Sequence, residues 1–210
     1  GVTSVVITGA GAICPAGTEV RLGEVMAGPA VTGAVPEVLG TDLAEAVRSR
    51  VVRAERITQL IARAAGRALT AARCVPADDA PRREVGIVVG TAFGCLLSNA
   101  AHQARVREAG PASASPRLFA ATVSNAAAGE IGIAYRLGGP AVTVTAGAAS
   151  GLVALLEGVA MVDDGRCATV VAGGGDALGP VVQRWLVAAG LETHPPSEAA
   201  AFLVLEAATT

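Results

Sequence analysis

The chain has 210 residues, enough to bury a sizeable core in one large domain. Apolar residues make up 52% of it, aromatic residues only 2%, and 26 residues are glycine, so we expect a closely packed core of Ala, Val, Leu and Ile. The net charge of −2 provides no basic excess for nucleic acid, and no apolar run approaches the roughly 20 residues that span a bilayer. With no signal-peptide pattern, we expect a cytoplasmic protein without nucleic-acid or membrane partners.

The cysteine and histidine residues show no spacing that is typical of a metal site. They are Cys14, Cys74, Cys95, Cys167, His102 and His194. No CxxC or Cys/His cluster occurs among them, so reduced thiols are the simplest interpretation. We expect neither a metal nor another cofactor.

Short apolar runs alternate with Ala-rich stretches in the first part of the chain. Residues 4–11 read as a strand that ends in a glycine turn, and residues 23–52 as the start of a helix followed by a surface loop. Residues 55–73 place Ile, Leu and Ala at helical spacing with arginines mostly opposite, which predicts an amphipathic helix. Residues 84–94 read as a strand with a glycine exit.

The same alternation continues to the end of the sequence. After a Pro-led loop, a helix is expected from about Asn125, then a strand over 141–145 and a buried apolar helix over 149–165. Two further strands are expected over 167–177 and 199–207, with a short helix between them. This order predicts an α/β fold whose five-stranded, mostly parallel sheet lies between helices.

Two glycine-rich stretches resemble nucleotide-binding loops only in part. In "GAGAIC" Cys14 occupies the place of the third glycine, and no acidic residue follows a second strand at the usual distance. "AGGGDA" (172–177) lacks the Lys-Ser/Thr of a P-loop. A strand-exit turn and close backbone packing are the better interpretations, and a small-molecule binding module stays open as an alternative.

The stretch "TVTAGAASG" (143–151) is typical of a strand, a turn of small residues and a helix. Such a turn can present a nucleophile, yet its apex is Ala148. The hydroxyls of Thr145 and Ser150 would need a nearby base, and Ser150 is better placed to cap the following helix. A standalone acyltransferase or hydrolase that uses Ser150 or Thr145 is the second alternative.

Several segments together resemble the β-ketoacyl-acyl carrier protein synthases of the thiolase superfamily. They are "VVITGAGAICPAG", "GIVVGTAFG", "FAATVSNAAAGEIGIAYRLGGPAVTVTAGAASG", "DDGRCATVVAGGGDA" and "AAAFLVLE", in matching order and spacing from Val5 to Glu206. The resemblance implies one thiolase-like βαβαβαββ half, a single domain over 1–210. The short "LETHPPSE" replaces the family's long charged loop, so we expect a protein that evolved to be short, with a trimmed chain as the alternative.

The resemblance also implies that the chain has no catalytic residue of its own. Alignment on Ser150 and Gly151 places the family's cysteine at Ala148, and a methyl group cannot form an acyl thioester. The family's catalytic histidines belong to a second half that has no counterpart here. The sequence thus resembles a chain-length factor of a type II polyketide synthase, which pairs with an active ketosynthase in a heterodimer or heterotetramer and reaches acyl carrier protein through that complex. A polyene-type product, reduced in every cycle, is a further expectation.

Two sets of site residues follow from the same resemblance. The third strand of the family lies at the sheet edge and pairs antiparallel with the partner, which assigns the interface to Ala141, Val142, Thr143, Val144 and Thr145. The tunnel for the growing chain is assigned to Phe93, Leu97, Leu118 and Phe119.

Overall fold

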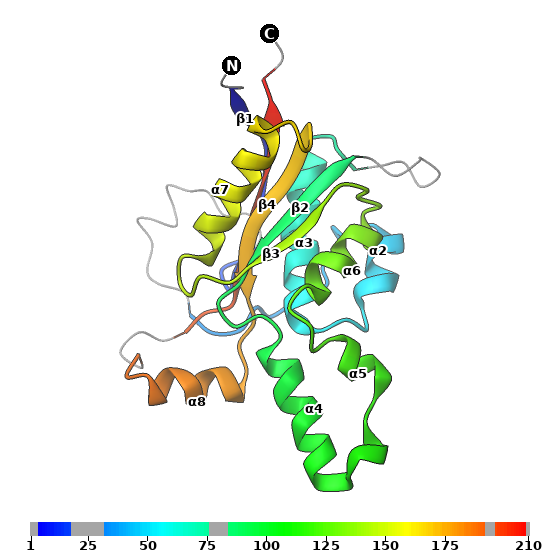
Figure 1. The fold of residues 1–210 in the computed structure, drawn as a ribbon, viewed down its shortest axis with the longest axis vertical. Helices are drawn as coiled ribbons and strands as arrows, with labels where there is room; N and C mark the ends of the chain where they lie inside the picture. Colours follow the sequence, from blue (N-terminus) through cyan, green and yellow to red (C-terminus); the bar gives the residue numbers. More distant parts are fainter. Residues whose placement is uncertain (1–3, 18–31, 76–83, 192–195, 209–210) are drawn as a thin grey trace.

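The computed structural model describes residues 4–17, 32–75, 84–191 and 196–208, which form a five-stranded sheet with helices on both faces (Figure 1). The strands are β1 (Val5–Ile13), β2 (Val85–Gly90), β3 (Ala141–Val144), β4 (Thr169–Asp176) and β5 (Ala199–Ala207), in the spatial order β1-β5-β4-β2-β3. β2 pairs in parallel with β3 and β4, whereas β5 runs antiparallel to β1 and β4. Only β5 is reversed, so the predicted, mostly parallel sheet is confirmed.

The helices form a layer on each face of the sheet and a group beyond its end. Their bounds are α2 (Glu45–Val51), α3 (Arg56–Ala71), α4 (Leu96–Ala109), α5 (Pro116–Ala120), α6 (Ala126–Ala134), α7 (Ser150–Asp163) and α8 (Pro180–Ala188), with a 3₁₀ turn at Pro111–Ser113. The helices α3, α6 and α2 cover one face, and α7 covers the other (Figure 1). In the same view α4, α5 and α8 extend past the end of the sheet. None of the described helices is long and apolar enough to cross a bilayer.

Two apolar cores result, one on each side of the sheet. On the α3 side, Leu60, Ile61 and Leu69 have no exposed surface and pack with Phe202 of β5. On the α7 side, Met161 packs with Leu205 of the same strand. Successive strand residues point to opposite faces, so one strand contributes to both cores. The amphipathic pattern that predicted α3 is therefore the pattern that builds the larger core.

The glycines of the first strand lie inside β1 and not in a turn after it, which corrects the expected strand end. A Cβ atom on Gly9 would lie 2.2 Å from the Ala68 carbonyl oxygen, and one on Gly11 would lie 2.3 Å from that of Ala64. α3 approaches β1 so closely that no side chain fits between them. The glycines are explained by helix-on-strand packing.

Two further expectations are corrected. Within residues 32–52, Val35, Val38 and Leu43 are buried and α2 follows them, so this part is not a surface loop; residues 23–31 lie outside the described residues. The α7 helix, expected to be a buried helix, exposes Leu152 and Leu156 by 68% and 69%. Only one side of α7 packs on the sheet.

An ion pair between a buried carboxylate and a partly exposed arginine holds the start of α3 to the start of β5. The Glu198 side chain is fully buried, and Arg56 donates to it from Nε at 2.7 Å and from Nη2 at 2.6 Å. The backbone N–H groups of Val35 and Leu178 donate to the same carboxylate, each at 2.9 Å. Burial alone would raise the pKa of Glu198, but the hydrogen bonds from Arg56 and the two N–H groups outweigh it and hold the pKa below its usual value.

Candidate functional site

The turn between β3 and α7 presents Ala148 at the surface. Gly147 adopts a positive φ of 56°, and an isolated bridge joins Ala146 to Ala148. The Ala149 N–H donates to the Ala146 carbonyl at 3.2 Å, which closes the turn. Ala148 is exposed, and its methyl group has no nucleophilic or acid–base chemistry.

The hydroxyl of Ser150 is buried and forms hydrogen bonds within the turn. It accepts a hydrogen bond from the Ala146 N–H at 2.9 Å and lies 2.6 Å from the Gly147 carbonyl and 3.0 Å from the Thr91 carbonyl. The expected helix cap is therefore wrong: the N-cap of α7 is Ala149, without a side-chain hydrogen bond. Among the described residues, neither Ser150 nor Thr145 bonds to a histidine, and His194 lies outside them.

The strand ends beneath the turn are held by close backbone contact. A Cβ on Gly90 of β2 would lie 2.2 Å from the Ser150 carbonyl oxygen, and one on Gly174 of β4 would lie 2.9 Å from Cα of Gly151. The expected close packing at "AGGGDA" is confirmed, although these glycines lie within β4 itself. The first turn of α7 thus rests directly on β2 and β4.

Asp176, at the end of β4, organises the loop that leaves β2. Its carboxylate accepts hydrogen bonds from the Thr91 hydroxyl at 2.6 Å and from the N–H groups of Ala92 and Phe93 at 2.9–3.1 Å. Sequence reasoning missed this role, although an acidic residue directly after a glycine-rich strand was a visible signal. The carboxylate therefore fixes the loop backbone at Phe93, shortly before α4 begins.

The third strand lies at the sheet edge, as the resemblance implies. β3 is the last strand in the order and pairs with β2 on one side. Its residues Ala141–Val144 are exposed or half-buried, and Thr145 just after them is exposed. The hydroxyl of Thr143 is buried without a hydrogen-bond partner among the described residues. The edge can accept another strand, and which chain would supply it stays a prediction.

The four predicted tunnel residues lie around the start of α4 and along α5. The Phe93 ring meets Trp185 of α8 edge-on at 5.4 Å between ring centres, and Leu97 lies against Gly179. Phe119 is 60% exposed and lies 5.7 Å from the His102 ring, while Leu118 is half-buried. The structure places all four near the end of the sheet where α4, α5 and α8 gather (Figure 1).

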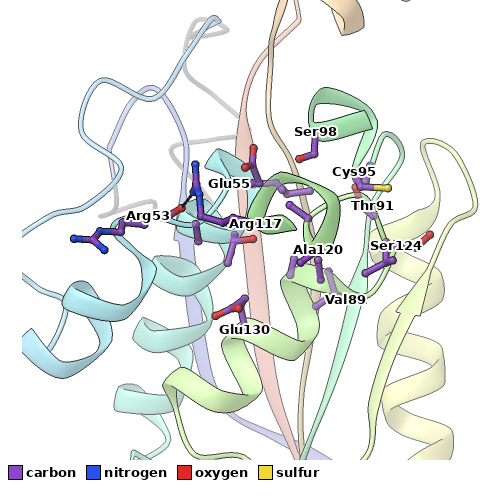
Figure 2. A pocket seen from close by; sticks show the side chains of 18 of the residues that line it. Arg53, Glu55, Val89, Thr91, Cys95, Ser98, Arg117, Ala120, Ser124 and Glu130 are labelled. Atoms are coloured by element: carbon purple, nitrogen blue, oxygen red, sulfur yellow. Dashed lines mark hydrogen bonds between the residues drawn. The ribbon is translucent and has the colours of Figure 1, made fainter. Parts of the chain in front are cut away.

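A cavity of about 280 Å³ lies beside these residues, between the first turns of α3, α4 and α6 (Figure 2). None of the four predicted tunnel residues lines it, but their neighbours Gly94, Cys95, Ser98, Ala120 and Ala121 do. The remaining lining residues are Arg50, Arg53, Ala54, Glu55, Ile57, Thr58, Val89, Thr91, Arg117, Val123, Ser124, Ala126, Ala127 and Glu130. The segments predicted to form a tunnel therefore border a cavity through different side chains, and the four assignments stay predictions.

Charged side chains surround one part of the cavity. Arg50 pairs with Glu130 at 3.5 Å, and Arg117 donates to the backbone carbonyl of Arg53 at 2.6 Å. Figure 2 shows Arg117 beside Glu55, with the Arg53 guanidinium directed away from the other labelled side chains. Within the described residues, no cluster of three or more His, Cys, Asp or Glu could hold a metal ion.

These features define a class of protein. A mixed five-stranded sheet between helices, with the third strand at the edge and a strand–turn–helix after it, is the thiolase-like fold of ketosynthases. The family model of the β-ketoacyl synthase N-terminal domain matches residues 39–204. The chain belongs to this family.

The relatives are ketosynthases and chain length factors. The chain is 34% identical over 129 residues to the tetracenomycin polyketide synthase ketoacyl synthase alpha subunit of Streptomyces glaucescens, a match that covers 59% of this chain and 30% of that protein. It superposes on the ishigamide ketosynthase/chain length factor with a TM-score of 0.75 at 24% identity, over 99% of this chain and 63% of that one. Both matches cover only part of the relative, and the second shows a shared fold.

Two further solved structures share the fold. A β-ketoacyl synthase from Burkholderia phymatum STM815 gives a TM-score of 0.75 at 17% identity, over 98% of this chain and 59% of that one. The type II complex AntDE:AntF, an acyl-carrier protein with its ketosynthase bound to the hexaketide, gives 0.72 at 20% identity, over 99% and 59%. The chain spans less than two thirds of the length of each of these relatives.

Proposed function

We propose that this chain is a non-catalytic, ketosynthase-like subunit of the chain-length-factor type. It pairs with an active ketosynthase and shapes the space into which a chain grows on acyl carrier protein. The observation that carries the proposal is the exposed turn after β3 in a β-ketoacyl synthase family member, whose apex is Ala148. The nearby hydroxyl of Ser150 is engaged in the turn and offers no substitute nucleophile.

Acyl labelling tests whether this chain lacks a nucleophile that can be acylated. We expect an acyl thioester to label the partner ketosynthase and to leave this chain without added mass, because neither Ala148 nor Ser150 can be acylated. The control is Ala148→Cys, whose exposed thiol should react with iodoacetamide in peptide mapping. An acyl or fluorophosphonate adduct on Ser150 or Thr145 would contradict the proposal and favour an acyltransferase or hydrolase.

The edge strand supports the pairing with a ketosynthase. β3 has an unpaired edge in the described structure, and apolar edge strands of soluble proteins are normally covered. An equivalent strand of the partner would add to it antiparallel through backbone hydrogen bonds. The resulting heterodimer or heterotetramer would then receive acyl carrier protein.

The tunnel assignment gives a second test. If Phe93 and Leu118 end the space for the growing chain, Phe93→Ala or Leu118→Ala should shift the products of the reconstituted complex to longer chains. Product masses give the readout, and Leu152→Ala on the exposed face of α7 is the control. Unchanged product length in both variants would contradict the assignment.

The product class is proposed to be of the polyene type, with the chain reduced in each cycle. The ishigamide ketosynthase/chain length factor, which this chain resembles in fold, is compatible with such a reductive system but does not distinguish it from others. Products made with and without a ketoreductase and a dehydratase, followed by absorbance of the conjugated chain, test this directly. Products that lack conjugation in the complete system would contradict the proposal.

A further inference from the structure

Three helices begin at the cavity beside β2, and none of them has a side-chain cap. The N-caps of α3, α4 and α6 are Glu55, Cys95 and Asn125, and none of these side chains accepts from the first turn that follows it. First-turn residues of all three helices line the cavity. Helix N-termini carry partial positive charge and point free N–H groups outward. The cavity is thus surrounded by hydrogen-bond donors.

The donors remain unused within the described part of the chain. The backbone N–H groups of Thr58, Ser98 and Ala127 have no hydrogen-bond partner there. Each of these residues lies in the first turn of its helix and lines the cavity. A ligand with oxygen acceptors would satisfy groups that the protein leaves free.

Two unpaired hydroxyls of otherwise buried residues give an independent indication of a ligand. Thr58 and Ser98 line the cavity, are each only 3% exposed, and make no side-chain hydrogen bond among the described residues. Nearby Thr91 donates to Asp176 and accepts from the Gly94 N–H, so its hydroxyl is already satisfied. Neither hydroxyl oxygen is among the fully buried, unpaired side-chain atoms of the described residues, so both still reach the cavity, and a hydrocarbon that displaced water from them would leave them unpaired.

The charged residues around the cavity are of both signs and do not by themselves select the charge of a ligand. Arg50 is neutralised by Glu130, and the half-buried Glu55 stands among the lining residues with no ion pair in the described part. Arg53 and Arg117 also line the cavity, so the Glu55 carboxylate is not the only charge there. Ketone and hydroxyl oxygens accept hydrogen bonds without a full charge.

The size of the cavity fits one end of a ligand. Its volume of about 280 Å³ lies just below the roughly 300–1,000 Å³ of pockets that enclose whole small molecules. Its other walls are apolar side chains such as Val89, Ala120 and Ala127. A chain with an apolar body and an oxygen near its far end matches both kinds of wall.

We propose that this cavity receives the distal end of the acyl chain, and that Thr58 and Ser98 select a chain whose distal end carries a ketone or hydroxyl oxygen. The proposal rests on the function proposed above. An acyl chain that is reduced along most of its length can still bind in this way when the end that was built first keeps a ketone or hydroxyl oxygen. Thr58 and Ser98 are then specificity residues on two different helices.

The test compares three neutral probes of equal length, the N-acetylcysteamine thioesters of octanoic, 7-oxooctanoic and 7-hydroxyoctanoic acid. They are titrated calorimetrically into the purified chain and into its complex with a ketosynthase. We expect at least one oxygenated probe to bind about tenfold more tightly than the octanoyl probe, as two added hydrogen bonds allow. The two oxygenated probes distinguish ketone from hydroxyl recognition.

The matched variants remove the hydroxyls and keep the shape. Thr58→Val with Ser98→Ala should bring the oxygenated and octanoyl affinities to within about twofold of each other. Thr70→Val, on the same helix and about 18 Å from Thr58 along its axis, should leave the tenfold preference intact. Equal binding of all probes to the unaltered chain, no binding of any probe, or a preference that survives the double substitution would overturn the inference.

Complex formation is measured separately by size-exclusion chromatography. A chain that prefers the oxygenated probe but does not pair with a ketosynthase would keep the cavity's selectivity and contradict the proposed function. A chain that pairs with a ketosynthase but shows no preference among the probes would support the proposed function and contradict the selectivity of the cavity. The two failures are therefore distinguishable.

Discussion

Glu198 is the residue on which several distant segments depend. It is fully buried, and its carboxylate holds Arg56 and the backbone of Val35 and Leu178. We expect Glu198→Gln to lower the free energy of unfolding by about 1–3 kcal/mol, because the substitution weakens charge-assisted hydrogen bonds to a buried group, while the Arg56 side chain is more than a third exposed and keeps contact with water. Urea unfolding measures this. The control is Glu157→Gln, which removes the exposed pair with Arg166 and should have a much smaller effect because water screens that pair.

The same carboxylate predicts a pH dependence. Its pKa is lower in the folded chain than the usual value of 4.5, so the ionised form favours folding. The stabilisation is complete above the unfolded pKa and is lost as the pH falls through the folded pKa. Unfolding midpoints between pH 6 and pH 3 should therefore drop more steeply for the unaltered chain than for Glu198→Gln. Parallel curves would contradict this role.

At the level of single residues, the sequence predicted some of the site and missed the rest for physical reasons. Ala148 was recognised because the turn around it is local in sequence. Asp176 and the two residues of the proposed specificity site, Thr58 and Ser98, were not, because their surroundings arise where helices and strands far apart in the chain meet. A threonine in the first turn of an amphipathic helix looks the same whether its hydroxyl faces water, a carbonyl or a cavity.

At the level of elements, β3 carries the prediction about assembly. The carbonyls of Pro140 and Val144 accept from β2, so by strand alternation the N–H of Thr143 points to the open edge. Thr143→Pro should remove that donor and spare the ladder with β2. We expect at least a tenfold loss of affinity for the partner ketosynthase in a pull-down titration, with circular dichroism unchanged.

Thr143→Val is the control for this substitution, because it keeps the N–H and removes only the hydroxyl. It should pair normally. Full pairing by Thr143→Pro would contradict strand addition at β3. Loss of helical signal in that variant would instead show that the strand tolerates no proline, and Ala141→Pro, at the other outward-facing position, would then replace it as the test.

The elements were predicted well where their hydrophobic period is strong. The amphipathic residues 55–73 became α3, and each predicted strand exists with bounds that differ by a few residues. The errors arise where tertiary contact overrides local pattern. Gly9 and Gly11 looked like a turn because nothing local tells that a helix backbone lies against them. The seven-residue α2 is too short to show a period among the glycines and prolines before it.

On the scale of the whole molecule, the two faces of the sheet are covered by helices to different extents. The α3 face is closed by three helices around the larger core, whereas in the described part of the chain α7 is the only helix on the other face. Leu152 and Leu156 lie on the outer side of α7 and are more than two thirds exposed. Large exposed apolar side chains at helical spacing, together with an open edge strand, favour association.

We therefore expect the isolated chain to self-associate as its concentration rises. In sedimentation velocity, Leu152→Glu with Leu156→Glu should shift the distribution toward the monomer, while the melting temperature changes by no more than a few degrees because both side chains are exposed. Val52→Glu, at another exposed apolar residue on a different part of the surface, should leave the self-association unchanged. A chain that stays monomeric at high concentration without any substitution would contradict this expectation, and would also weaken the case for an obligate partner at β3.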